Sequence, residues 1–170
     1  VEKTNWSGLG IVCPRSLFGE KKSRQEFERT GVYLLVGEGD GVAPEIYIGE
    51  ADELRSRLSS HFKESKLDWE YVVFFVSKDN SLNKAHVRYL EWRLIELARE
   101  ANRAQIVNGN AGSKPSLSEA DIAEAEGFLD EIRQCFPIIQ LDIFETPIKS
   151  TSRRTITELF ATFKGCAARG

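Results

Sequence analysis

Four residues with side chains suited to proton transfer and anion binding lie within a stretch of the chain that runs from residue 33 to residue 61. Tyr33 and Tyr47 lie in two apolar runs, GVYLLV and EIYIG, which are joined by the Gly- and Pro-rich linker GEGDGVAP. Arg57 and His61 follow at a spacing of four residues, which places them on one side of a helix. We expect these four side chains to converge near one edge of a small sheet.

A carboxylate in unusual surroundings completes this set. Glu91 follows the core residue Leu90 directly, and Tyr89, Trp92 and Leu94 crowd it with bulky groups. Burying a carboxylate in this way is costly unless it is paired or holds a cation. A single glutamate with open positions suits Mg²⁺, which keeps several waters and takes few protein ligands.

These residue types fit the hydrolysis of a phosphodiester. A metal ion would polarise the phosphoryl oxygen, and an arginine would stabilise the charge that develops in the transition state. A tyrosine or a histidine would handle the proton of the attacking water. The expected cofactor is therefore one Mg²⁺ or Mn²⁺ ion.

The elements that must position these residues follow from periodicity. The expected fold is α/β (α+β), with a small three-stranded antiparallel sheet flanked by helices and an extra C-terminal helix and strand. Residues 1–22 carry glycine and proline breakers and are expected to be irregular. We expect strands at 31–36, 45–49, 69–77 and 138–145, and helices at 52–63, 82–101 and 118–135.

The sequence resembles the GIY-YIG nuclease family. GVY at 31–33 matches the first signature with Val32 in place of isoleucine, and YIG at 47–49 matches the second. In YIGEADELRSRLSSHF, the family pattern of leucine, two residues, arginine and a tyrosine or histidine four later falls on Arg57 and His61. The resemblance covers about residues 31–110.

The resemblance assigns roles to these positions. It implies that Tyr33, Tyr47, Arg57 and His61 are catalytic, with the first tyrosine near the attacking water, and that the metal-binding glutamate of L-E-x-x-L-I is Glu91. A supporting asparagine falls on Asn108 in QIVNGN, with Asn102 as the second choice. Gly31 and Gly49 belong to the signatures, and Arg55 and Lys63 are candidate phosphate contacts.

The chain departs from the family in two places. Thirteen residues separate the signatures (34–46), slightly more than is usual in the family, and a longer Gly-rich hairpin loop would absorb them. Position 50 is glutamate where the repair nucleases have lysine, which argues against repair-type handling of the substrate. The chain looks closer to a bacterial subgroup that continues into a small C-terminal domain, of which LFATFKGCAARG resembles the opening.

We therefore expect an N-terminal extension (1–30), a nuclease-like core (31–110), a helix–strand extension (111–145), and a linker with the start of a second domain (146–170). No apolar run approaches the roughly 20 residues that span a bilayer, and the N-terminus has no apolar signal core. The expected location is the cytoplasm, without a membrane partner. Three unclustered cysteines favour free thiols over a zinc site or disulfides.

The net charge is −3, yet the charges are unevenly distributed. Residues 116–145 hold eight acidic side chains and one basic, which leaves 18 acidic and 22 basic residues elsewhere. A basic face that binds DNA is compatible with this distribution. Two alternatives to a DNA endonuclease stay open: a catalytically lapsed module that binds nucleic acid, and a protein-interaction domain that uses the acidic helix at 118–135.

Overall fold

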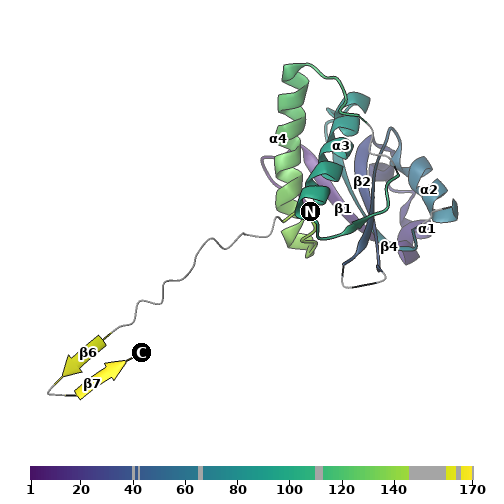
Figure 1. Cartoon of the computed structure of the whole chain (residues 1–170). Coiled ribbons are helices and arrows are strands. Elements are labelled where there is room, and N and C mark those ends of the chain that lie inside the picture. Colours follow the sequence, from purple (N-terminus) through teal and green to yellow (C-terminus); the bar gives the residue numbers. More distant parts are fainter. Residues whose placement is uncertain are drawn as a thin grey trace.

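The computed structural model describes residues 1–39, 41, 43–64, 67–109 and 113–145, and the backbone of 160–163 and 166–169. Figure 1 shows a central sheet with helices on both sides. The elements are β1 (Gly8–Pro14), α1 (Arg15–Lys21), η1 (Gln25–Glu28), β2 (Gly31–Gly37), β3 (Glu45–Ala51), α2 (Leu54–Glu64), β4 (Trp69–Ser77), α3 (Lys84–Ala101), β5 (Gln105–Ile106), α4 (Glu119–Cys135), η2 (Pro137–Ile139), β6 (Phe160–Phe163) and β7 (Cys166–Arg169).

The sheet has five strands in the order β1-β4-β2-β3-β5. All neighbouring pairs are antiparallel except β3 and β5, which are parallel over two residues. Strand β2 is buried along its whole length, as its nearly continuous apolar sequence predicts. Strands β4, β2 and β3 form the antiparallel centre that the sequence indicated.

Two apolar cores lie on opposite faces of this sheet. The alternation of side chains along a strand sends Leu34 and Ile48 to the face that α3 and α4 cover. The same alternation sends Tyr33 and Leu35 to the face that α1 and α2 cover. Because the pairing of β2 with β3 fixes which residues share a face, it also decides which helix each site residue can reach.

Two expectations about the sheet were wrong. The expected three strands are too few, because the N-terminal residues that looked irregular form β1, which pairs with β4 over seven positions, and helix α1. Gly8 and Gly10 read as breakers, but the rings of Trp6 and Phe75 occupy the space where their side chains would be. The strand expected at 138–145 is absent; the short helix η2 and turns replace it.

The helices begin and end close to their expected positions. Asn83 caps the N-terminus of α3, where its side chain accepts hydrogen bonds from two backbone N–H groups at 2.9 and 3.1 Å. Ser118 caps α4. On α2, Leu54 and Leu58 are buried, whereas Phe62, one turn further on, is 42% exposed. Among the described residues, no helix has the length and apolar character to cross a membrane.

The C-terminal residues that are described form an antiparallel pair, β6 with β7. The part of the expected linker that precedes β6 lies outside the described residues.

Candidate active site

The glycines beside the tyrosines allow close packing. Gly49 lies directly opposite Tyr33 in the pairing of β2 with β3. A Cβ atom at Gly49 would lie 2.4 Å from Tyr33 Oη and 2.5 Å from its Cζ, so any side chain there would displace the ring. A Cβ atom at Gly31 would lie 2.5 Å from the carbonyl oxygen of Phe75 in β4. The signature glycines therefore let the chain pack around the tyrosine at its buried position.

Helix α2 brings Arg57 and His61 onto the two tyrosines. Arg57 Nε donates to Tyr33 Oη at 3.2 Å, and Arg57 Nη2 donates to Tyr47 Oη at 3.3 Å. His61 Nε2 lies 2.7 Å from Tyr33 Oη, and its ring centroid is 4.9 Å from that of Tyr47. The structure thus brings together the four residues whose convergence the sequence predicted.

Burial sets the protonation states in this cluster. Burial, and to a lesser degree the neighbouring Tyr47, raises the pKa of Tyr33 well above its usual range, so its hydroxyl stays protonated. Burial, with the nearby Arg57 charge, lowers the pKa of His61 to about 4. A neutral His61 can accept a hydrogen bond from the Tyr33 hydroxyl at Nε2. Arg57 then donates to Tyr33, and Tyr33 donates to His61.

The two tyrosines have different environments. Tyr33 is 0% exposed, and its hydroxyl lies between Arg57 and His61. Tyr47 is partly exposed and borders an open pocket. Of the two hydroxyls, that of Tyr47 is therefore the one that a ligand in this pocket could reach, whereas Tyr33 orients Arg57 and His61.

Glu91 approaches from the opposite face of the sheet. It lies on α3, which covers the Ile48 face, and it borders the same pocket as Tyr47. Among the described residues, its carboxylate has no hydrogen-bond or ion-pair partner. Burial, followed by repulsion from Glu50, raises the pKa of Glu91 from 4.5 to about 7. The candidate site therefore straddles the edge of β3, with two phenols, the Arg57 cation and neutral His61 on one side and a carboxylate on the other.

Glu50 has partners on α3 that we did not predict. Lys84 Nζ lies 2.8 Å from Glu50 Oε2 and 3.1 Å from Asp52 Oδ2. Arg88, one turn further along α3, lies 4.0 Å from Glu50 Oε1. Position 50 thus carries a carboxylate, but α3 supplies cations beside it and reduces the repulsion on Glu91.

Asn108 fixes the outer edge of β3. Its Oδ1 accepts from Ile48 N at 2.9 Å and its Nδ2 donates to Ile48 O at 2.6 Å, so the side chain binds β3 as another strand would. The second choice, Asn102, instead ends α3 in the left-handed conformation with φ 50°. Asn108 thus supports β3 beside the candidate site, and its role in catalysis stays a prediction.

The two candidate phosphate contacts differ in their surroundings. Arg55 Nε donates to the carbonyl of Lys22 at 2.7 Å, and its Nη2 pairs with Glu28 at 2.7 Å, so its guanidinium is already engaged. Lys63 is exposed in the last turn of α2. Arg57, although bound to both tyrosines, remains largely exposed and can face a ligand.

A single divalent cation fits the donor set here. The described part of the chain holds no group of three or more His, Cys, Asp or Glu side chains able to hold a metal. Glu91 offers one half-buried carboxylate beside an open pocket, without a hydrogen-bond or ion-pair partner among the described residues. Mg²⁺ and Mn²⁺ favour oxygen ligands, and Mg²⁺ usually keeps several waters, so Glu91 with the adjoining space meets their needs.

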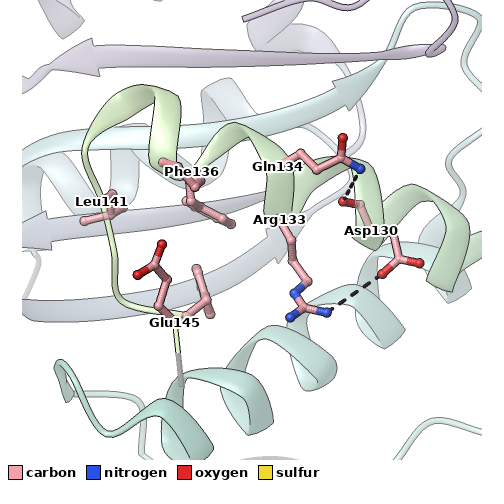
Figure 2. Close-up of a pocket in the computed structure, with 8 residues that line it drawn as sticks. Asp130, Arg133, Gln134, Phe136, Leu141 and Glu145 are labelled. Atoms are coloured by element: carbon pink, nitrogen blue, oxygen red, sulfur yellow. Dashed lines mark hydrogen bonds and ion pairs between the residues drawn. The ribbon is translucent and has the colours of Figure 1, made fainter. Parts of the chain in front are cut away.

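A second hollow lies away from these residues. It has a volume of about 720 Å³ at the C-terminal end of α4, and Figure 2 shows Phe136, Leu141 and Glu145 around it, with Arg133 directed to Asp130. None of the predicted site residues lines it. We therefore place the candidate chemistry at the edge of β3 rather than in this larger hollow.

Comparisons with models of known protein families, with curated proteins and with solved structures each found no match to this chain. The family assignment therefore stays a prediction that rests on the residues themselves. Sequence reasoning missed Lys84 and Arg88 as partners of Glu50. Their signal was present, because Lys84, Arg88 and Glu91 are spaced four and three residues apart on one side of a helix.

Proposed function

We propose that this chain is a metal-dependent endonuclease domain that hydrolyses DNA phosphodiester bonds in the manner of the GIY-YIG nucleases. One observation carries the proposal. The Arg57 guanidinium is bound to two tyrosine hydroxyls, and one of these tyrosines, Tyr47, borders the same open pocket at the edge of β3 as Glu91, whose carboxylate is unpaired among the described residues. Fixed positive charge beside a vacant carboxylate suits a ligand that combines an anion with a divalent cation.

Glu91 would hold the metal, which when bound polarises the phosphoryl oxygen and lowers the pKa of a bound water. Arg57 faces the scissile phosphate and stabilises the charge that builds on its oxygens. Its two hydrogen bonds to phenols hold the guanidinium in place before substrate arrives, so less freedom is lost on binding. Arg57→Lys cannot reproduce this two-armed geometry.

The two tyrosines and His61 position the attacking water and the Arg57 guanidinium and provide hydrogen-bond donors and acceptors. The Tyr47 hydroxyl borders the pocket and positions the attacking water. Tyr33 keeps its proton because burial raises its pKa, so it orients Arg57 and passes a hydrogen bond to His61 rather than acting as a preformed base. Neutral His61 offers Nε2 as the acceptor at the end of this chain.

The test is cleavage of supercoiled plasmid and of short single- and double-stranded oligonucleotides in Mg²⁺ or Mn²⁺. We expect cleavage by the wild-type protein, and losses of at least about 100-fold in Glu91→Gln and in Arg57→Met. Glu100→Gln and Arg99→Met are matched controls, because both residues are exposed at the end of α3. Cleavage that persists in Glu91→Gln would overturn the site assignment.

The same experiment separates the alternatives. Salt-sensitive DNA binding without cleavage in either metal would favour a lapsed nucleic-acid-binding module. Absence of any DNA binding would favour a protein-interaction domain. That last alternative has weaker support from α4, because several of its acidic residues are already paired, among them Glu126 with Arg93 at 2.7 Å, Glu131 with Lys3, and Asp130 with Arg133.

A further inference from the structure

The pocket beside Glu91 has walls that hydrolysis alone does not require. Its volume is about 440 Å³, which is the size of a small-molecule site. Tyr47 and Glu91 form the wall toward the proposed reaction centre. Its apolar lining comes from Trp92, Ile95 and Pro115. A pocket with an aromatic ring among polar groups therefore adjoins the place where we put the scissile phosphate.

Trp92 is unlike the other tryptophans of this chain. Trp6 and Trp69 are 6% and 1% exposed, whereas Trp92 is partly exposed and lines the pocket. Two cations lie near its ring: Lys114 Nζ is 5.5 Å and Arg93 Cζ is 5.9 Å from the centroid. An accessible aromatic ring among basic groups is what stacking of an unpaired base requires.

Polar groups on the remaining walls suit the edge and the phosphate of a nucleotide. Each amide side chain has two N–H donors and two acceptor lone pairs, and Asn108 uses one of each on Ile48. The hydroxyl of Ser113 also lines the pocket. Arg88, whose side chain is 62% exposed, stands at the same pocket with its charge available to a phosphate.

We propose that this pocket receives one unpaired nucleobase of the substrate, stacked on Trp92, next to the phosphate that is cleaved. The proposal rests on the proposed endonuclease function and names its substrate class: DNA with an unpaired nucleotide at the cleavage position. A base inside an intact duplex is covered by its neighbours, so it reaches such a chamber only after it leaves the stack.

In this arrangement the incoming base displaces Lys114 from the Trp92 ring. It is exposed, and its interaction with the indole is weaker than the stacking of a base on the same ring. The displaced ammonium group stays beside the incoming phosphate. One lysine thus covers the ring in the free protein and contributes to electrostatic attraction in the complex.

Tryptophan fluorescence tests the proposal in the full chain, with EDTA present so that metal-dependent cleavage does not occur. Because Trp6 and Trp69 are buried, a change of emission on binding should report mainly on Trp92. We expect a thymidine oligonucleotide to quench this emission, and a blunt duplex of equal length to quench it less because its bases are stacked on one another. Trp92→Leu should remove the quenching and weaken single-strand binding by about 5- to 100-fold. Trp92→Phe keeps a ring and should keep most of the affinity.

Cleavage assays separate this proposal from the endonuclease proposal. Wild-type protein should prefer an oligonucleotide with one unpaired nucleotide over its fully paired counterpart, and Trp92→Leu should lower that ratio. Metal-dependent cleavage without quenching, or with equal single-strand affinity in Trp92→Leu, would overturn the base pocket and leave the endonuclease standing. Quenching that depends on Trp92, without cleavage in any metal, would support the pocket and overturn the endonuclease.

Discussion

The negative charge of Glu91 lowers the free energy of unfolding of the protein, and replacing this residue should reveal the effect. Its carboxylate is half-buried, lacks an ion-pair partner among the described residues, and lies near the negative charge of Glu50. Glu91→Gln keeps the shape and removes the charge. We therefore expect this variant to be more stable than the wild-type protein at neutral and alkaline pH, although it should be inactive.

The magnitude follows from the pKa, which rises from 4.5 to about 7 on folding. Each unit of pKa difference corresponds to about 1.4 kcal/mol, so the full cost of ionising Glu91 in the folded protein is about 3 kcal/mol. The side chain is partly exposed, and screening by solvent reduces this to about 1–2 kcal/mol. For a chain of this length that gain corresponds to a rise in Tm of about 2–8 °C.

The pH dependence has a definite sign. Below the unfolded-state pKa of 4.5, Glu91 is protonated in both states and the variant has no advantage. Between 4.5 and about 7 the unfolded chain loses its proton first, so the wild-type protein loses stability relative to the variant as the pH rises. Above a pH of about 7, Glu91 is ionised in both states, and the difference in stability between the variant and the wild-type protein stays constant.

Urea denaturation at about pH 4 and about pH 8 measures this difference, with Glu100→Gln as the exposed control on the same helix. Mg²⁺ adds a second readout, because a ligand that binds only the folded state stabilises it. At about pH 8, Mg²⁺ should stabilise the wild-type protein and leave Glu91→Gln unchanged. A variant that is less stable than wild type at that pH, or whose gain is independent of pH, would refute the reasoning.

Three further predictions concern the supports of the site. Gly49→Ala places a methyl group against the Tyr33 ring and should cost about 1–3 kcal/mol in urea denaturation, together with the activity; an unchanged midpoint would contradict the close packing. Asn108→Leu removes two hydrogen bonds to the β3 backbone and should speed amide exchange in that strand, whereas unchanged protection would argue against this role. Lys84→Met removes a cation that lowers the pKa of Glu91, so the increase of activity with pH that follows the ionisation of Glu91 should occur at a higher pH in this variant. An unchanged pH–activity profile would exclude this coupling.

Much of the candidate site was predictable because its determinants are local. The two apolar runs indicated the strands that carry Tyr33 and Tyr47, and the spacing of Arg57 and His61 indicated that both lie on one side of a helix. The long helix that carries Glu91 was recognisable from its own apolar stripe. Each of these features depends on residues that are near one another along the chain.

The errors arose where distant residues decide the outcome. Strand β1 looked irregular because its glycines are breakers in isolation, yet Trp6 and Phe75 supply the packing that replaces their side chains. Residues 138–145 alternate like a strand but form η2 and turns, from which Leu141, Ile143 and Phe144 pack into the core on the α3 and α4 face of the sheet. Propensity is a weak guide at such positions because tertiary contacts override it.

The sequence by itself determined which side chains could do chemistry here and which helix or strand carries each one. Only the tertiary structure decided that Tyr33 is buried while Tyr47 borders the pocket, that Lys84 and Arg88 stand beside Glu50, and that Trp92 lines a chamber next to Glu91. The physical reason is that burial and charge pairing are set by contacts between elements far apart along the chain. The edge of β3, where two faces of the sheet meet, is where those contacts come together.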